Sequence, residues 1–289
     1  MYTDAHGQKW WKGNLHTHTT LSDGRRTPQQ VLRLYADFGY DFLALTDHWV
    51  HGPGGREQGL LVLPGCEYNV GGNRGANGIY HILAIGCHTA PDITRQSTPQ
   101  AMIDAIHAAG GLAGLAHPAW SLNSPEQIAA LRGVDFTEIF NSISDLPYNA
   151  RPYSGLVLDI AAAHGHLLPL AATDDAHFYG TADICRSFCY VQADSCTPTA
   201  LLAALAAGRF YASQGPTLAV QKQGRCLTVR CSPVEQIVYF TDCAWHPHRA
   251  EVGHGLTEGH FEAGADESWV RVEVRDAAGR YAWSQYVTL

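Results

Sequence analysis

The pattern that most constrains the fold is an alternation of short apolar runs with helices over the first two thirds of the chain. Four of these helices are expected to begin at a Ser or Thr that Pro follows. The hydroxyl of such a residue caps a free backbone N–H group, and Pro at the first helical position gives up no hydrogen bond. The four starts are Thr27-Pro28, Thr98-Pro99, Ser124-Pro125 and Thr197-Pro198. A fifth helix is expected over residues 152–164, with Gly165 as its cap.

The apolar runs between these helices predict strands. Runs of this length between amphipathic helices are typical of parallel strands in an α/β fold. In such folds the chemistry takes place at the carboxyl ends of the strands. The predicted strands are residues 42–45, 60–63, 82–85, 112–116, 136–140 and 167–171.

After about Gly208 the pattern becomes β-like, with Gly, Pro and charged turns between apolar segments and no convincing helix. We therefore expect two domains, an α/β domain over residues 1–208 and a small β-rich subdomain over residues 209–289. The strands predicted in the second domain are residues 218–220, 227–229, 237–240, 269–272 and 281–287.

Composition excludes several classes of function. The 289 residues have a formal net charge of −8, which argues against binding long nucleic acids through a basic face. No apolar stretch is long enough to span a bilayer, and the first residues lack the apolar run of a signal peptide. The 8 cysteines have no zinc-ribbon or disulfide spacing. We expect a cytoplasmic protein without a membrane partner.

Residues that bind divalent ions recur along the chain, nearly always where a predicted strand ends. Imidazole and carboxylate groups suit borderline and hard cations. A single histidine is more often a hydrogen-bonded core or loop residue, but so many at strand ends predict a site with more than one metal. His81 is the exception, because it precedes its apolar run. The candidate ligands are His16, His18, Asp23, His48, Glu67, His81, His117, Asp175 and His177.

These motifs resemble, in order, those of the PHP (polymerase and histidinol phosphatase) superfamily. The resemblance covers residues 12 to about 190, and residues 208–216 resemble a string that follows the barrel in PHP proteins with a small β domain. It implies a distorted (β/α)7 TIM-like barrel with two or three divalent metal ions (Mn, Fe or Zn) at its mouth, and hydrolysis of phosphoesters. The motifs are His16-Thr17-His18, Ser22-Asp23-Gly24, Thr46-Asp47-His48, Gly65-Cys66-Glu67, Ala116-His117-Pro118 and Asp175-Ala176-His177.

The resemblance also implies three metal subsites. His16, His18, Glu67 and Asp175 would hold the first ion. Glu67 would bridge to a second ion held with His81 and His117, and Asp23, His48 and His177 would surround a third. Some relatives have His where this chain has Asp23. The neighbouring Asp174 fits the Asp-x-His pattern less well and is expected to cap a turn or support the site.

The expected activity is that of a phosphoesterase that cleaves a small phosphorylated metabolite or nucleotide. A water bridging two cations loses a proton near neutrality and attacks phosphorus in line. Glu67, Asp175 and His177 are the expected catalytic residues. Arg25, Arg74, Arg151 and Arg186 are candidate phosphate ligands, of which Arg151 and Arg186 are preferred. Asn141 is a further candidate for substrate binding, or alternatively a loop cap.

Two alternatives remain open. The same cations could polarise a carbonyl group, which gives amide, ester or lactone hydrolysis. The chain could instead be a non-catalytic metal-binding or sensing module, although a complete ligand set argues against this. A second histidine-rich group is expected to be a surface feature rather than a metal site. It consists of His246, His248, His254 and His260.

Overall fold

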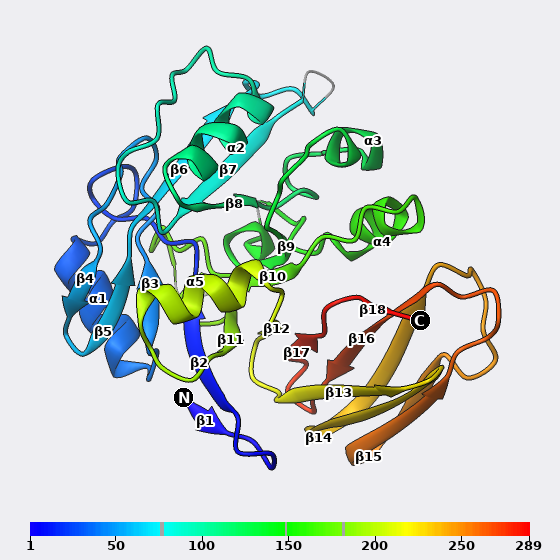
Figure 1. Ribbon diagram of the computed structural model, residues 1–289. Helices are drawn as coiled ribbons and strands as arrows, with labels where there is room; N and C mark the ends of the chain where they lie inside the picture. Colours follow the sequence, from blue (N-terminus) through cyan, green and yellow to red (C-terminus); the bar gives the residue numbers. More distant parts are fainter. Residues whose placement is uncertain (76–77, 148, 181–182) are drawn as a thin grey trace.

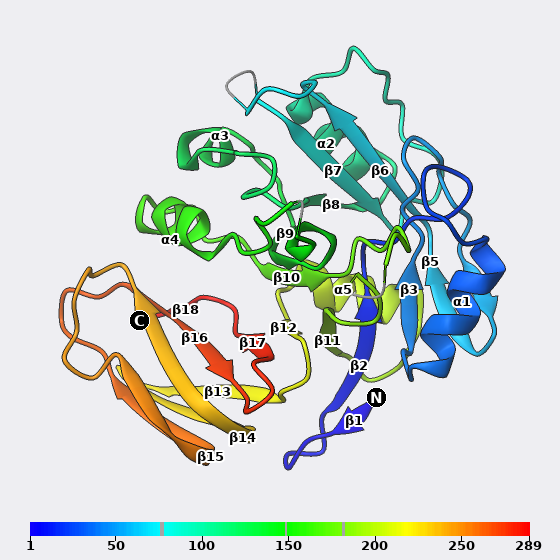
Figure 2. The same ribbon diagram turned by 180° about the vertical axis from the view of Figure 1, so that it is seen from behind.

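The computed structural model describes residues 1–75, 78–147, 149–180 and 183–289. It shows a mixed α/β unit that carries the helices, and a layer of long strands on one side of that unit (Figure 1; Figure 2). Within the described residues no helix is both long and apolar enough to cross a membrane.

All five predicted helices are present. In the four that begin with Ser/Thr-Pro, the hydroxyl of the capping residue accepts a hydrogen bond from the backbone N–H three residues later. Gly165 follows the fifth helix with a φ of +91°, a conformation that glycine adopts without strain. The helices are α1 (Pro28–Asp37), α2 (Pro99–Ala108), α3 (Pro125–Ala129), α4 (Gly155–Ala163) and α5 (Pro198–Ala206).

One sheet contains two of the predicted parallel strands, β3 (Phe42–Ala44) and β5 (Leu60–Leu63), together with β2 (Lys9–Asn14), which was not predicted. β2 pairs with β3 and β3 pairs with β5, both in parallel. Three further strands, none of them predicted, pair with these in antiparallel orientation. β1 (Tyr2–Thr3) and β11 (Phe188–Gln192) pair with β2, and β4 (Gly55–Glu57) pairs with β5.

A second sheet has the order β10-β9-β8-β7-β6. The prediction of parallel strands is correct for β8, β9 and β10 and wrong for β7, which is antiparallel to both neighbours. Because the described strands form two hydrogen-bonded sheets, the closed (β/α)7 barrel stays a prediction. The strands are β6 (Gly65–Val70), β7 (Tyr80–Ile85), β8 (Leu112–Leu115), β9 (Phe136–Asn141) and β10 (Leu170–Thr173).

The two sheets pack against each other through a shared apolar core. Phe42 and Leu63 from the first sheet belong to the same buried cluster as Leu83 and Phe136 from the second. Within the second sheet, Gly114 of β8 leaves room for the ring of its neighbour Phe136 in β9, since a Cβ atom at that position would lie 2.3 Å from the ring. This core fixes the carboxyl ends of strands from both sheets around one volume.

The β-rich character after Gly208 is confirmed, and helices are absent from residues 209–289, all of which the structure describes. Through β12 these strands continue the first sheet, in the order β13-β14-β16-β17-β12-β11-β2. The domain boundary at residue 208 stays a prediction. The strands are β12 (Phe210–Ser213), β13 (Leu218–Gln223), β14 (Cys226–Thr241), β15 (Ala250–Glu262), β16 (Trp269–Arg275), β17 (Tyr281–Trp283) and β18 (Val287–Thr288).

Candidate metal centre

Two extended segments run side by side at the centre of the site. The segment that follows β2 carries His16 and His18, and the segment that follows β10 carries Asp175 and His177. The backbone N–H of His18 donates to the carbonyl of Ala176, and that of Asp175 donates to the carbonyl of His16. Residues two apart in an extended segment point to the same side, so His16 and His18 face the same way. The pairing places Asp175 beside His16, and the φ of +50° at Asp175 turns its backbone out of the extended conformation there.

Four donor atoms converge at one point. The Nε2 atoms of His16 and His18 lie 3.2 Å apart, and each lies 3.1 Å from Oε2 of Glu67 and 3.1 Å from Oδ1 of Asp175. All four side chains are buried. Ligands about 2.0 Å from a tetrahedral ion lie about 3.3 Å from one another, so the spacing here suits a divalent cation.

A second group shares Glu67. Its other oxygen, Oε1, lies 2.6 Å from Nδ1 of His81 and 3.6 Å from Nε2 of His117. His81 reaches this group from the start of β7 because that strand is antiparallel to β8, so that its first residues lie beside the carboxyl end of β8. The antiparallel pairing explains why His81 precedes its apolar run whereas the other candidates follow theirs.

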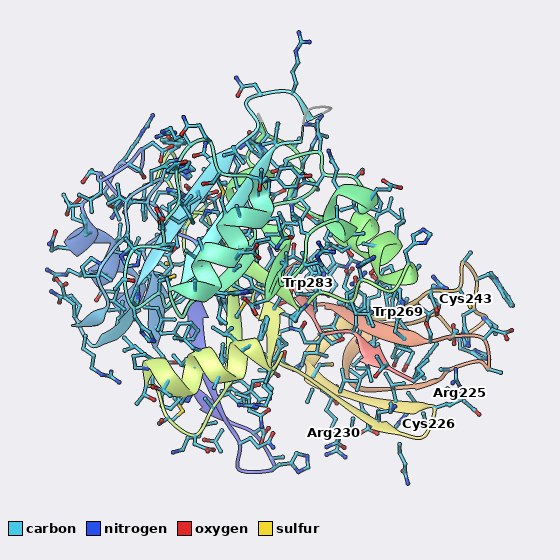
Figure 3. All side chains as sticks on the ribbon, turned by 45° about the horizontal axis from the view of Figure 1, so that its top comes forward. Arg225, Cys226, Arg230, Cys243, Trp269 and Trp283 are labelled. Atoms are coloured by element: carbon cyan, nitrogen blue, oxygen red, sulfur yellow. The ribbon has the colours of Figure 1, made fainter. Side chains whose placement is uncertain are left out.

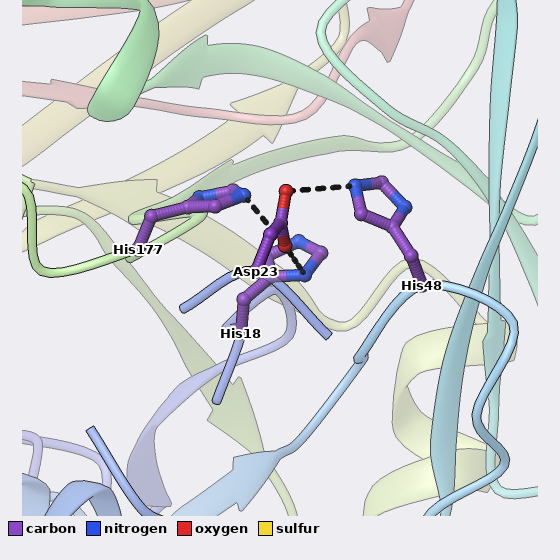
Figure 4. A group of neighbouring side chains, drawn as sticks. All are labelled: His18, Asp23, His48 and His177. Atoms are coloured by element: carbon purple, nitrogen blue, oxygen red, sulfur yellow. Dashed lines mark ion pairs between the residues drawn. The ribbon is translucent and has the colours of Figure 1, made fainter. Parts of the chain in front are cut away.

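A third group surrounds Asp23 (Figure 4). The Asp23 carboxylate lies 3.4 Å from Nε2 of His177, 3.6 Å from Nδ1 of His18 and 3.9 Å from Nε2 of His48. Asp23 is about half exposed, so this group lies at the mouth of the site. His18 contributes one ring nitrogen to this group and the other to the first.

The histidine tautomers also fit metal binding. Nδ1 of His177 lies 2.8 Å from the carbonyl oxygen of Asp175, which can only accept, so this nitrogen carries the proton and Nε2 keeps its lone pair. Nδ1 of His16 lies 2.8 Å from Oε1 of Glu138 in the same way. Such contacts to the second nitrogen orient metal-binding imidazoles in proteins.

The electrostatics of the site favour positive charge. Burial lowers the pKa of His18, but the carboxylates of Asp175 and Glu67 outweigh it and raise the pKa to about 9. Burial raises the pKa of Glu67, but His16, His81 and His48 hold it well below its usual value. The carboxylates therefore stay ionised, and their negative charge stabilises a positive charge on neighbouring groups.

The backbone conformation of two ligands and the unpaired donor atoms of two ligands are further evidence of a functional site. His117 and Asp175 have φ values of +31° and +50°, which are costly for residues other than glycine and occur often at functional sites. The buried Oδ1 atom of Asp175 and the buried Nδ1 atom of His48 have no hydrogen-bond partner among the described residues. A cation bound in the first donor group would give Oδ1 of Asp175 a partner, and the donor set fits divalent metal ions.

Sequence reasoning missed Glu138, whose carboxylate contacts several residues of the site. It is fully buried in β9. Its carboxylate contacts His16, accepts from the backbone N–H of His117 at 2.9 Å, and accepts from Asn141 and from Thr173 at 2.7 Å each. A charged residue inside an apolar strand is the only signal that could have identified it.

The expected supporting role of Asp174 agrees with its contacts. Its carboxylate accepts from the backbone N–H groups of Arg186 and Ser187 and from the hydroxyls of Tyr35 and Ser142. Burial raises its pKa to about 6 even though these hydrogen bonds act in the opposite direction. Asp174 therefore fixes the turn that carries Asp175 and belongs to none of the three donor groups.

A cavity of about 270 Å³ opens above the three groups. Its floor consists of predicted ligands, and its walls are Trp120, Ile143, Ser144, Asn149 and Tyr179. Trp120 lies edge-on to His81 and His117. None of the described residues that line the cavity is a lysine or an arginine.

The structure does not place the three predicted substrate-binding residues in this lining. Arg151 is exposed, and Arg186 forms an ion pair with Asp145 at 2.6 Å. Asn141 is buried and donates to Glu138 and to Asp175, so it supports the donor groups. Arg25 lies beside the cavity instead, with its guanidinium 4.6 Å from the centre of the Tyr179 ring.

The second histidine-rich group belongs to none of the donor groups found among the described residues. His254 and His260 are exposed on β15 and contact Glu235 and Glu258 respectively. His246 packs on the ring of Phe261, with 4.6 Å between the ring centres. These positions agree with the expected surface role.

No protein-family model matches the sequence, and a search of curated proteins finds no match. Among solved structures, the chain is similar to a two-domain protein from Bacteroides vulgatus described as containing a predicted PHP-like metal-dependent phosphoesterase. The likeness has 18% identity and a TM-score of 0.59, and covers 100% of this chain and 97% of that one. An amidohydrolase from Chromobacterium violaceum matches with 20% identity and a TM-score of 0.42, over 59% of this chain and 89% of that one. The first likeness shows that this chain has the two-part fold of that PHP-like protein.

Proposed function

We propose that this protein is a metal-dependent hydrolase that cleaves phosphate esters of small molecules. The observation that carries the proposal is the convergence of donor atoms from His16, His18, Glu67 and Asp175 at spacings of 3.1–3.2 Å. The fold shared with a PHP-like protein described as a metal-dependent phosphoesterase supports it.

Two or three divalent ions, Mn, Fe or Zn, would occupy the three donor groups. Glu67 would bridge the first two ions, because its two oxygens face different groups. Asp23, His48 and His177 would hold the third. Such ions, when bound, act as Lewis acids toward a phosphate oxygen and acidify a water molecule.

The residues of the chain have separate tasks in this scheme. Glu67, Asp175 and His177, our proposed catalytic residues, line the cavity and would hold the reacting groups in place. Glu138 fixes the orientation of His16. The side chain of Trp120 packs edge-on against His81 and His117, where it would limit the access of water.

The charge of an anionic substrate would be balanced mainly by the bound cations. The hydroxyl of Ser144 already donates to Asn141, and the amide of Asn149 already donates to the carbonyl of Ile143. Arg25 at the rim is the nearby cation that could contact a part of the substrate outside the reacting group.

The lack of Lys and Arg in the described cavity lining also favours a second candidate, the hydrolysis of amides, esters or lactones. A carbonyl substrate carries no phosphate charge, so it needs no cationic side chain beyond the metal ions.

A substrate screen separates the two candidates. The purified protein is reconstituted with Mn, Fe or Zn and assayed with phosphate monoesters, phosphate diesters, carboxylic esters and lactones, each with and without a chelator. Release of phosphate or alcohol from phosphate esters that the chelator abolishes supports the proposal. Turnover of carboxylic substrates alone supports the second candidate, and metal binding without any turnover supports a sensing module.

A further inference from the structure

The segment that forms one wall of the cavity is attached to the C-terminal strands. We call residues 142–147 and 149–151 the wall segment; it supplies Ile143, Ser144 and Asn149 to the cavity lining. The backbone N–H of Arg151 donates to the carbonyl of Ser144, which folds the segment back on itself. Asn149 accepts from the indole N–H of Trp120, so the segment also contacts this second residue of the cavity wall.

Tyr153 fixes the end of the wall segment. It pairs with Phe140 at the end of β9 through an isolated bridge, beside the backbone hydrogen bond from Asn141 to Pro152. Its hydroxyl donates to Glu273 of β16 at 2.7 Å. The side chain therefore connects the wall segment to the C-terminal strands.

An arginine on β16 organises this connection. The side chain of Arg271 is fully buried and donates to both carboxylate oxygens of Asp159 in α4, at 2.9 and 2.7 Å. It also donates to the Tyr153 hydroxyl at 3.3 Å, and its guanidinium lies 4.2 Å from the centre of the Phe240 ring. A buried guanidinium is costly unless its donors are paired, so the geometry of the groups around it is tightly fixed.

Aromatic residues of the C-terminal strands complete the contact. Trp283 donates to Glu273 at 2.8 Å and stacks against Phe140 and Tyr153. Trp283 belongs to β17 and lies on the side of the C-terminal strands that faces the helix-bearing unit (Figure 3). Tyr286 donates to Asp159 at 2.9 Å and packs edge-on against Trp269 of β16.

We propose that the strands after Gly208 position the cavity wall through Arg271 and Tyr153, with Tyr153 as the positioning residue. The C-terminal part would then serve the site without contributing a ligand to it. This inference rests on the proposed function only for its effect on substrate binding, because the position of the wall segment can be measured without turnover.

Two matched variants test the inference. Tyr153→Phe removes the hydroxyl that connects the wall segment to Glu273 and Arg271, while Tyr286→Phe removes a hydroxyl from the same network at Asp159. Tyr153→Phe loses hydrogen bonds to two charged groups, Glu273 and Arg271, and Tyr286→Phe loses one, to Asp159, so Tyr153→Phe should be the more destabilised variant in thermal unfolding, and its exchange in the wall segment is compared with its exchange elsewhere in the chain. The primary measurement is hydrogen exchange of backbone amides in peptides from the wall segment.

The expected result is faster exchange in the wall segment of Tyr153→Phe, by about fivefold or more, with wild-type exchange there in Tyr286→Phe. For any ester that the wild type hydrolyses, KM should rise several-fold in Tyr153→Phe with kcat within about twofold. Equal exchange in the two variants, or faster exchange with an unchanged KM, would overturn the inference. If the wild type hydrolyses no ester, the proposed function fails, and hydrogen exchange alone still decides whether Tyr153 positions the wall.

Discussion

The imidazole of His16 lies between two carboxylates, with Nδ1 2.8 Å from Glu138 and Nε2 3.1 Å from Glu67. Glu138 faces only protein groups, whereas Glu67 lines the cavity. The first contact thus orients the ring, and the second places its free lone pair in the donor group.

Replacing Glu138 by Gln tests this orienting role. The amide keeps the size of the side chain but not its charge. It therefore holds the ring of His16 less firmly and makes the Nε2 atom of His16 a weaker base. Loss of such a partner typically lowers metal affinity about 10- to 100-fold. Competition with a chromophoric chelator measures the affinity, and Glu126→Gln on the exposed face of α3 is the control. Wild-type affinity in Glu138→Gln would remove the orienting role.

Metal removal should lower the thermal stability of the protein. The donor groups exist only in the folded chain, so a metal present at 100 times its Kd stabilises that chain by about 2.7 kcal/mol. We expect Tm to fall when a chelator is added and to recover when Mn or Zn is restored. Thermal unfolding followed by circular dichroism measures the shift. A Tm that is insensitive to both treatments contradicts a metal centre at these residues.

The histidines of the C-terminal strands should not contribute to the centre. The double substitution of His246 and His248 by Ala is expected to leave metal content and catalytic activity unchanged, because neither residue belongs to a donor group. A small loss of stability is expected from the contact between His246 and Phe261. Metal analysis by mass spectrometry, with His48→Ala as the positive control, checks this. A drop in metal content of the double variant would show a second site.

Thiol reactivity should follow burial. Burial raises the pKa of Cys66 and of Cys189 to about 12, so at pH 8 almost none of either thiol is ionised. Cys226 is exposed and lies in the C-terminal strands (Figure 3). Because the thiolate is the reactive form, iodoacetamide should modify Cys226 first, and labelling of the buried thiols should increase as the pH rises. Peptide mass spectrometry after timed labelling measures this order, and early modification of Cys66 would mean that β6 opens in solution.

The sequence predicted the donor groups more fully than the strand pairing around them. Helix caps such as Thr27 and Thr98 are local signals, since each needs only a hydroxyl and the N–H three residues later. The residues of the three groups were found because ligand chemistry restricts them to His, Asp and Glu at strand ends. The direction of β7 depends on its long-range pairing with β6 and β8, which no local pattern of apolar residues specifies.

The residues that surround the donor groups could not be predicted in the same way. Arg151 and Arg186 were chosen for their charge and their position near the expected mouth, but loop geometry places Arg186 against Asp145. Ser144 and Asn149 reach the cavity from a segment that is followed by Tyr153, whose hydroxyl donates to Glu273 of β16. Such contacts join residues more than 100 positions apart, and periodicity carries no information about them.

The most direct test of the central claim is a comparison of wild type, Glu67→Gln and the exposed control Glu57→Gln. Metal content per chain and chelator-sensitive hydrolysis of phosphate esters are measured on the same samples. We predict two or three ions per chain and phosphate release in the wild type and the control. In Glu67→Gln we predict lower metal content and no turnover, because an amide cannot bridge two cations as a carboxylate does. Full metal content and full activity in Glu67→Gln would contradict the account.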